Sequence, residues 1–354
     1  MYLCPKRLSI NIPSWNQPKS SMTSTLLPIR IGADVGGTFT DVVLLTAAGE
    51  LYTQKTPSTP PHFQQALLSA IRQLLASAGE NGVRVAAVAH GTTVATNAVL
   101  EHRGARTALV TTQGFRDVLE LRRIRAPQMY DLFFEKPPPL VERALRFELT
   151  ERVSATGEII RPLHADELEA LKTKLTHAEV EAVAVCLLHS YAFPEHEAQV
   201  GAFLRQQLPH LDVSLSCEVL RERREYERTA TTVVNAYVQP VMRSYLQALR
   251  SGLRGEEIHA PLLIMQSAGG LMPEEEAAQR PVFALESGPA AGVLATRAIA
   301  GRLGLPNVIS FDMGGTTAKA AMIEGGAIAY SAEYEVGNTL SAAGGQGARL
   351  VGGG

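Results

Sequence analysis

Two stretches of the sequence carry the same glycine-rich turn with the same polar residues. The first reads ADVGGTFTDVVLL from residue 33, and the second reads FDMGGTTAKAAMI from residue 311. Aligned without a gap, residues 31–52 and 309–330 share Ile, Asp, two Gly, Thr and a final Tyr, with Asp34 and Asp312 standing 278 residues apart. In each copy an apolar strand precedes the aspartate, two glycines turn the chain and a second apolar strand follows. A repeat at this distance indicates a duplicated domain.

The residue types in these turns suit the binding of a triphosphate. Glycines let successive backbone N–H groups face an anion, threonine adds a hydroxyl donor, and aspartate can hold Mg²⁺ through its water shell. Two facing hairpins can therefore grip one triphosphate, whereas the alternative is that each motif is only a β-turn. We predict Asp34 and Asp312 as catalytic and metal-binding residues. The predicted nucleotide-binding residues are Gly36, Gly37, Thr38, Thr40, Gly314, Gly315, Thr316 and Thr317.

Further polar residues are candidates for the same site. Asp41 is either a third catalytic residue, as a Mg²⁺ carboxylate or general base, or a surface acid at the start of a strand; Lys319 takes its place in the second copy. The stretch AHGTTVATNAVL places polar residues where a strand ends and a helix begins, a usual position for ligand-binding groups in α/β sheets. The alternative is helix capping by threonine, with the histidine buried in its strand. The predicted substrate-binding residues are His90, Thr92, Thr93 and Asn97.

Composition and charge exclude several classes of partner. A chain of 354 residues with 45% hydrophobic residues is long enough for about two globular domains. A net charge of -2 gives no electrostatic surface for nucleic acid or an anionic membrane, which favours small or neutral partners. No apolar run reaches the ~18 residues of a membrane span. The three cysteines have no paired spacing, so we expect neither disulfides nor a thiolate metal site, and predict a cytoplasmic protein.

Strands and helices alternate along the chain, as in an α/β protein. Three strands in 29–56 read as an antiparallel meander, and βα units follow. Residues 122–162 are rich in Arg and Pro and indicate an irregular insertion. A strand is expected over 213–219, and the long helix that follows it over 222–250 is expected to kink at Pro240. We predict that residues 1–28 are a disordered or spurious extension, with Met22 as a candidate start. A first domain is predicted over 29–220 and a second over 221–354.

The paired hairpins resemble the actin, sugar kinase and heat-shock chaperone superfamily, in which two related domains each contribute a phosphate-binding hairpin to an ATP cleft. More specifically, several motifs resemble, in their order, the hydantoinase A and 5-oxoprolinase family, whose members include N-methylhydantoinase and the acetone carboxylase β subunit. The resemblance begins near residue 29 and continues to the end of the chain. It rests on GADVGGTFTDVVLL, AHGTTVATNAVLEHRGARTALVTTQGFRDVLEL, CLLHSYAFPEHE, REYERTATTVVNAYVQPVM, LLIMQSAGGL, SGPAAGV and FDMGGTTAKA.

The resemblance implies a duplicated, ribonuclease H-like α/β ATPase fold, with ATP and Mg²⁺ as cofactors. It also implies ATP-dependent opening of a cyclic amide of the hydantoin or 5-oxoproline type, or activation of a ketone in the acetone branch. The amide carbonyl is deactivated by resonance, and transfer of a phosphoryl group to its oxygen would make that oxygen a good leaving group. The implied partners are a small cyclic amide, a hydantoinase B-type subunit and, at full length, further copies of the chain.

The sequence ends soon after the second glycine turn, at a point where an α/β domain needs more strands and helices to cover its sheet. We therefore expect a truncated chain with an incomplete second domain. Two hypotheses follow: an enzyme, or the N-terminal portion of one, and a non-catalytic fragment or subunit that acts only with a larger partner. Coding sequence that continues in frame beyond Gly354 would support the first.

Overall fold

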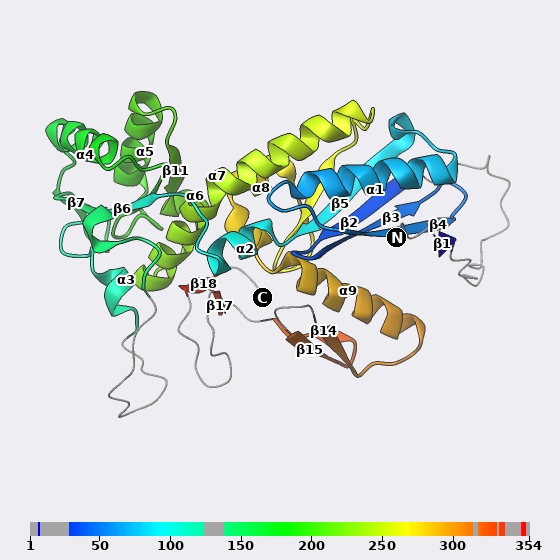
Figure 1. The fold of residues 1–354 in the computed structure, drawn as a ribbon. Helices are drawn as coiled ribbons and strands as arrows, with labels where there is room; N and C mark the ends of the chain where they lie inside the picture. The colour runs from blue at the N-terminus through cyan, green and yellow to red at the C-terminus, as the bar shows by residue number, and fades with distance from the viewer. Residues whose placement is uncertain are drawn as a thin grey trace, which may run out of the picture. The chain divides into compact units, whose positions relative to one another are not determined.

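The chain folds into two compact units, each assembled from segments that are distant in sequence (Figure 1). The computed structural model describes residues 6–7, 28–123, 138–313, 318–330, 333–336 and 348–351. The predicted division into domains over 29–220 and 221–354 stays a prediction, and most of the extension over 1–28 lies outside the described residues. The first unit comprises Met1–Val94, Ser244–Ala277 and Glu286–Ala329, and the second comprises Ala95–Arg243, Ala278–Leu285 and Tyr330–Gly354.

A seven-stranded sheet forms the centre of the first unit, in the order β1-β4-β3-β2-β5-β12-β13. The predicted antiparallel meander is confirmed, and β5 and β12 extend it in parallel. Helix α1 packs on β3 and β4 with one apolar face buried, because its apolar residues recur at helical spacing. The elements are β2 (Ile29–Val35), β3 (Phe39–Leu45), β4 (Leu51–Pro57), α1 (Phe63–Ala78), β5 (Val85–Thr92) and β12 (Leu262–Met265).

The second glycine motif also lies between two antiparallel strands of the first unit. Strands β14 (Val308–Met313) and β15 (Ala318–Glu324) pair, and β16 (Ala327–Ile328) follows. Asp312 lies opposite Lys319, as Asp34 lies opposite Asp41 in the first hairpin. The repeat predicted from the sequence is therefore confirmed at the level of strand pairing. Helix α9 (Ser287–Arg302) packs on these strands.

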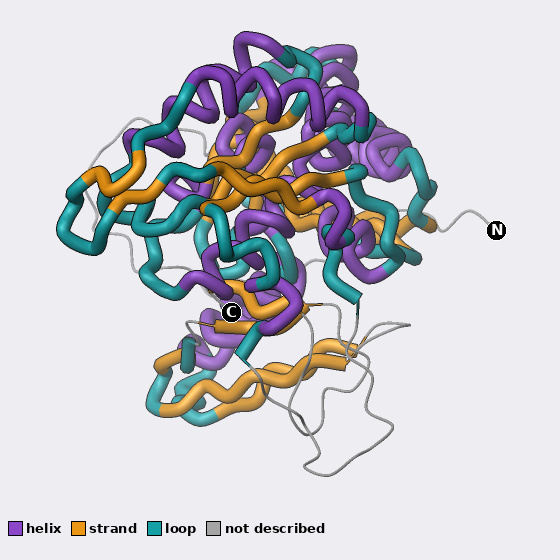
Figure 2. The backbone as a smooth tube through the Cα atoms, turned by 90° about the vertical axis from the view of Figure 1, so that its left-hand side faces the viewer, coloured by secondary structure: helices purple, strands orange, loops and turns teal. Residues whose placement is uncertain are grey.

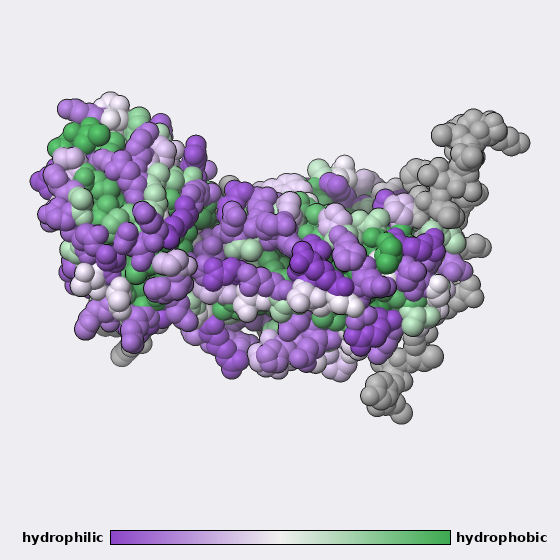
Figure 3. Space-filling model, turned by 90° about the horizontal axis from the view of Figure 1, so that it is seen from above, coloured by the Kyte–Doolittle hydropathy of each residue, from purple (hydrophilic) through white to green (hydrophobic). Residues whose placement is uncertain are grey.

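One side of the β14–β15 pair carries exposed apolar residues. Ile309, Phe311 and Met313 alternate along β14, and each is more than 60% exposed. Met322, opposite Ile309, is 55% exposed. On the face of the molecule seen in Figure 3, by contrast, hydrophilic residues predominate and hydrophobic ones are scattered among them.

The second unit is built on a parallel four-stranded sheet in the order β11-β10-β6-β7. All residues of β6 and β10 are buried, as expected for strands covered on both faces. Helix α5 packs on β10 and β11 and also contacts α4. Figure 2 shows the backbone with its helices in purple packed against strands in orange. The elements are β6 (Thr107–Thr112), β7 (Arg146–Leu149), α4 (Ala165–His177), β10 (Ala182–Cys186), α5 (Glu195–Gln207) and β11 (Asp212–Leu215).

Two sequence predictions of local structure need correction. The insertion over 122–162 is not wholly irregular, because it contributes β7 to the sheet and forms the β8–β9 hairpin; residues 124–137 lie outside the described residues. The strand expected over 213–219 ends at Leu215, and Ser216 begins a helical turn. That turn forms because the Glu197 carboxylate accepts hydrogen bonds from the Ser216 hydroxyl and the Cys217 N–H, an interaction that the local sequence does not reveal.

Helix α7 (Glu225–Gly255) runs through Pro240 as a single helix, and the kink expected at Pro240 stays a prediction. None of the helices in the described part of the chain is both long and apolar enough to cross a membrane. The other described elements are β1 (Lys6–Arg7), α2 (Val94–Leu100), α3 (Val118–Leu121), β8 (Arg152–Val153), β9 (Ile159–Arg161), α6 (Ser216–Val219), β13 (Leu271–Pro273), α8 (Glu274–Gln279), β17 (Glu333–Val336), β18 (Ala348–Val351) and the 3₁₀ turns Gly82–Arg84, Arg143–Leu145 and Pro281–Ala284.

The two cysteines in the described residues are buried free thiols, and we predict that both are unreactive in the folded protein. Burial raises the pKa of Cys186, and raises that of Cys217 to about 12, so neither forms the reactive thiolate at pH 8. In a Cys4→Ser background, Ellman's reagent should label no thiol at pH 8 and two after unfolding in urea. Rapid labelling of either thiol in the folded protein would contradict the burial.

Candidate phosphate-binding site

Two glycines enclose the carboxylate of Asp34 near the end of β2. Gly91 lies opposite Asp34 on β5, and a Cβ added to it would lie 3.0 Å from Asp34 Oδ1. Gly288, in the first turn of α9, would place a Cβ 3.3 Å from the same oxygen. Any larger residue would crowd the carboxylate at either position. The two glycines therefore form a cradle in which the Asp34 carboxylate and a small ligand atom can approach the backbone.

Electrostatics at Asp34 favour a bound cation. The pKa of Asp34 is raised, first by desolvation and then by the charges of Asp41 and Asp312, while Lys55 lowers it by a smaller amount. The residue as a whole is exposed, so the desolvation arises locally, where the carboxylate meets the glycine backbone. Three carboxylates that repel one another hold a proton or a cation more readily than one alone. The structure thus brings together the three aspartates predicted from the sequence.

The first glycine turn is closed by main-chain and hydroxyl hydrogen bonds. The Gly36 N–H donates to Phe39 O at 2.9 Å, and the Ser58 hydroxyl donates to Gly36 O at 2.7 Å. Thr40 is buried, and its hydroxyl lies 3.0 Å from that of Ser58, so it holds the turn from within. Gly37 and Thr38 are exposed at the tip. The exposed tip is therefore the part of the motif that can meet an anion directly.

Asp41 forms an ion pair in this structure. Lys55 Nζ lies 2.7 Å from Asp41 Oδ2, and the two residues are cross-strand neighbours on β3 and β4. Both side chains are about half exposed, so the pair contributes little to stability. Lys55 was not predicted as a site residue, although the meander places Asp34, Asp41 and Lys55 in one cross-strand row. This cation near Asp34 can also meet a phosphate.

The second hairpin places a lysine where the first has Asp41. Asp312 is exposed, and Lys319, opposite it, forms an ion pair with Glu286. Desolvation lowers the pKa of Lys319. Glu286 has a φ of 60° and directly precedes α9, so a strained residue begins the helix that carries Gly288. The predicted residues Gly314, Gly315, Thr316 and Thr317 lie outside the described residues.

His90 lies in the core of the first unit. Its Nε2 is 2.7 Å from the Tyr245 hydroxyl, its Nδ1 has no hydrogen-bond partner among the described residues, and burial lowers its pKa to about 4. The neutral ring matches the alternative of a buried strand histidine. Its role in substrate binding stays a prediction.

The predicted threonines bond to backbone around the start of α2. The Val94 N–H donates to the Thr92 hydroxyl at 3.2 Å, and the Thr93 hydroxyl donates to Val35 O at 3.1 Å. Ser287, which the sequence did not single out, bonds to both the N–H and the carbonyl of Thr92 at 3.3 Å. It thereby fixes the start of α9 beside the end of β5. Asn97 lies half-buried on α2, and its ligand role stays a prediction.

Comparison with known proteins places the chain in a family. Residues 30–208 match the family model described as the hydantoinase/oxoprolinase N-terminal region, and residues 228–349 match the model described as hydantoinase/oxoprolinase. An uncharacterized protein of Methanocaldococcus jannaschii, MJ0964, is 40% identical over 88% of this chain and 46% of its own length. Caprolactamase subunit alpha of Pseudomonas jessenii is 34% identical over 91% of this chain and 49% of its own length. 5-oxoprolinase 1 of Arabidopsis thaliana is 31% identical over 90% of this chain and 28% of its own length.

Two solved structures share the fold. The crystal structure of ATP-dependent caprolactamase from Pseudomonas jessenii has a TM-score of 0.75 at 34% identity, covering 83% of this chain and 43% of that one. The nucleotide-free structure of acetone carboxylase has a TM-score of 0.80 and covers 92% of this chain and 48% of that one. Because the sequence identity is 23%, this likeness shows the fold alone. The chain spans about half the length, or less, of the relatives it matches.

The α/β architecture with its two glycine hairpins confirms the fold class predicted from the sequence, which is related to actin, sugar kinases and heat-shock chaperones. Caprolactamase and acetone carboxylase share this fold. The chain belongs to the hydantoinase/oxoprolinase family.

Proposed function

We propose that this chain provides the phosphate-binding part of an enzyme that opens a cyclic amide at the expense of ATP. The observation that carries the proposal is the Asp34 carboxylate, held between Gly91 and Gly288 with its pKa raised by desolvation and then by neighbouring aspartates. The names of caprolactamase and 5-oxoprolinase support the choice of a cyclic amide as substrate. Phosphoryl activation of the carbonyl oxygen is the chemistry that we propose for it.

The described residues suit a magnesium ion that is held mainly by water and phosphate. Among them there is no cluster of three His, Cys, Asp or Glu side chains arranged as a metal cage. Mg²⁺ usually keeps several waters and takes only one or two carboxylates together with substrate phosphates. Asp34 and Asp312 meet that requirement, because a divalent cation beside them would offset the desolvation, and relieve the carboxylate repulsion, that together raise the pKa of Asp34.

The chain's own groups would position and neutralise a triphosphate. Bound Mg-ATP would supply the phosphoryl group that activates the amide oxygen. The exposed tip of the first hairpin, at Gly37 and Thr38, offers backbone N–H groups and a hydroxyl to that anion. Lys55 and Lys319 add positive charge from the neighbouring strands. Such preorganised donors act mainly by positioning and by charge stabilisation in the transition state.

We further propose that the enzyme works with a hydantoinase B-type subunit. The name of caprolactamase subunit alpha shows that this relative is one subunit of a larger enzyme. The exposed apolar side of β14–β15 is one surface of the chain that a further polypeptide could cover.

The proposal predicts ATP hydrolysis that depends on a cyclic amide. The longest polypeptide that the coding region specifies should be purified together with the proposed hydantoinase B-type subunit. The complex should be assayed with caprolactam, 5-oxoproline and hydantoin. We expect at least one of them to stimulate ADP release, with one ring-opened product per ADP. Failure of all three to stimulate ATP hydrolysis, together with ATP-dependent carboxylation of a ketone such as acetone, would favour the ketone-activating alternative.

A further inference from the structure

A single buried hydroxyl joins the start of α9 to the end of β5. Ser287 is the first residue of α9 and is fully buried. Its Oγ accepts a hydrogen bond from the Thr92 N–H and donates one to the Thr92 carbonyl, both at 3.3 Å. Thr92 is also fully buried, so bulk water does not compete for these groups. The main chain at the end of β5 is therefore tied to the first turn of a helix that is distant in sequence.

This tie lies beside the cradle of the Asp34 carboxylate. Gly91 directly precedes Thr92, and Gly288 directly follows Ser287. Each glycine is so close to Asp34 Oδ1 that an added Cβ would lie 3.0 or 3.3 Å from that oxygen. Neighbouring Cα atoms are only about 3.8 Å apart. The Ser287 hydroxyl therefore sets the distance between the two walls of the cradle.

The wall formed by β5 is fixed without Ser287. The N–H and the hydroxyl of Thr93 both donate to the Val35 carbonyl, at 3.0 and 3.1 Å. Strands β2 and β5 also pair in parallel as far as Val35 and Thr92. Because Asp34 directly precedes Val35, the carboxylate and the β5 wall belong to one pair of bonded strands.

The wall formed by α9 is held by few buried contacts. Of the sixteen residues of α9, all of them described, only Ser287 and Ala300 are buried, and Ala300 lies in the last turn. Glu286 directly precedes the helix with a φ of 60°, and its ion pair with Lys319 is partly exposed, so this pair contributes little. Apolar packing therefore does not fix the first turn, and the buried hydrogen bonds of Ser287 anchor it.

We propose that Ser287 is a positioning residue, which keeps Gly288 beside Asp34 and so preserves the cradle in which a metal-bound phosphate approaches the backbone. This role rests on the phosphate-binding function proposed above. Without the hydroxyl, both main-chain groups of Thr92 lose their bond to α9, and the first turn of the helix can move away from β5. A misplacement of about 1 Å can cost on the order of 10²-fold in rate. We therefore expect loss of the hydroxyl to weaken nucleotide binding.

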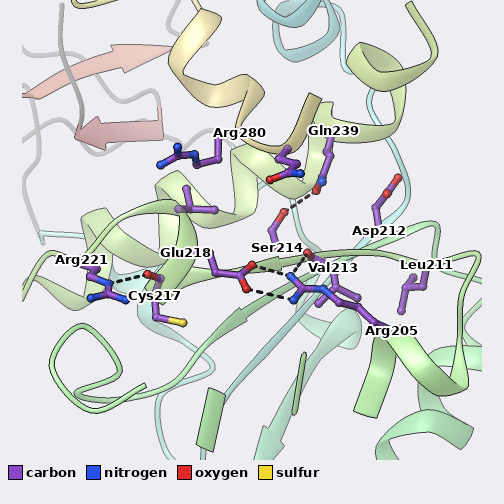
Figure 4. Close-up of a pocket in the computed structure, with 12 residues that line it drawn as sticks. Arg205, Leu211, Asp212, Val213, Ser214, Cys217, Glu218, Arg221, Gln239 and Arg280 are labelled. Atoms are coloured by element: carbon purple, nitrogen blue, oxygen red, sulfur yellow. Dashed lines mark hydrogen bonds and ion pairs between the residues drawn. The ribbon is translucent and has the colours of Figure 1, made fainter. Parts of the chain in front are cut away.

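The second unit offers a matched control. Ser214 lines the pocket of about 650 Å³ shown in Figure 4 and is 3% exposed. Its hydroxyl donates to Gln239 Oε1 at 2.8 Å and accepts from Asn235 Nδ2 at 2.9 Å. Like Ser287, it is a buried serine with one donated and one accepted hydrogen bond, but it belongs to a different unit from Asp34. Ser214→Ala therefore removes the same kind of interaction away from the cradle.

The test measures nucleotide affinity rather than turnover. Mg–AMP-PNP, an ATP analogue that resists hydrolysis, should be titrated calorimetrically into the longest polypeptide that the coding region specifies. We expect Ser287→Ala to raise the dissociation constant at least ten-fold without loss of binding stoichiometry. Ser287→Cys keeps the size of the side chain but bonds more weakly, so it should raise the dissociation constant at least three-fold. Ser214→Ala should lower the melting temperature about as much as Ser287→Ala does, with a dissociation constant within twofold of wild type.

A merely structural role for Ser287 predicts a different result, because a destabilised protein loses binding sites and keeps the affinity of those that remain. Unchanged dissociation constants in both Ser287 variants, or an equal rise in Ser214→Ala, would overturn the positioning role and leave the proposed function intact. If Ser287→Ala does not fold, Ser287→Cys decides, and a rise of less than three-fold contradicts the role. Absence of nucleotide binding by the wild-type chain would overturn the proposed function and, with it, the role of Ser287.

Discussion

Asp34→Asn is expected to lower lactam-dependent ATP hydrolysis by about 10²-fold or more while the protein stays folded. The substitution keeps the shape of the side chain between Gly91 and Gly288 but removes the charge that we propose to act on the metal-bound triphosphate. Loss of one such electrostatic contact typically costs on the order of 10²-fold in rate. The turnover number should be measured in the longest polypeptide that the coding region specifies, with saturating lactam and Mg-ATP.

The stability of the same variant should not fall. The pKa of Asp34 is raised in the folded state, so the folded protein binds a proton at Asp34 more tightly than the unfolded chain does. Stability from this group is therefore present at low pH and is lost as the pH rises through the raised pKa. At pH 7 the ionised carboxylate opposes folding in the absence of ligand. We expect Asp34→Asn without nucleotide to melt at the same temperature as wild type or higher at pH 7, with no gain at pH 3.

Two other aspartates serve as comparisons. Asp312→Asn should reduce turnover as Asp34→Asn does, because both carboxylates are proposed to hold the metal. Asp41→Asn should have a smaller effect, since Lys55 already pairs with Asp41 at 2.7 Å in a half-exposed position. If both Asp34→Asn and Asp312→Asn keep turnover within about threefold of wild type, the aspartates only shape turns, because asparagine also serves well in that role.

The sequence predicted those parts of the fold that depend on local pattern. Alternating apolar residues in β2 and β3 and the glycines between them define a hairpin whatever surrounds it, and the same holds for β14 and β15. The strand expected over 213–219 was wrong beyond Leu215 because a carboxylate 19 residues before Ser216, that of Glu197, stabilises a helical turn there. No pattern within the turn itself carries that information.

In the candidate site, too, local sequence pattern reveals some residues, and only tertiary packing reveals the others. The aspartates were found because the motif repeats, whereas Gly91 and Ser287 matter only through neighbours that are distant in sequence. Gly91 is needed because Asp34 lies opposite it on the adjacent strand, and Ser287 bonds to Thr92 across 195 residues. The surroundings of His90 are likewise set by Tyr245, which lies 155 residues further along the chain. Burial of this kind depends on tertiary packing and cannot be read from a strand end alone.

A buried polar network in the second unit gives the largest expected effect on stability. Arg228 is 1% exposed and Glu197 is fully buried. The Ser216 hydroxyl links the two side chains, because it donates to Glu197 at 2.9 Å and accepts from Arg228 Nη1 at 3.0 Å. Glu197 also accepts from the Leu187 N–H, and Arg228 donates to the Leu187 carbonyl. The network therefore ties the end of β10 to α5, α6 and α7.

Arg228→Met is expected to lower the free energy of unfolding by about 3–5 kcal/mol, because it leaves the buried Glu197 carboxylate without its compensating charge. The matched control is Arg254→Met, which changes an exposed arginine on the same helix and should alter stability by no more than about 0.5 kcal/mol. Urea unfolding followed by circular dichroism measures both variants.

A double variant separates loss of the charge from loss of packing. Glu197→Gln with Arg228→Met should cost at least about 1 kcal/mol less than the sum of the single changes, because the glutamine leaves no buried charge for the arginine to balance. If the two effects instead add, the cost of Arg228→Met comes from lost packing and from the hydrogen bonds to Ser190 and Leu187. An Arg228→Met cost no larger than that of Arg254→Met would show that the network does not stabilise the second unit at all.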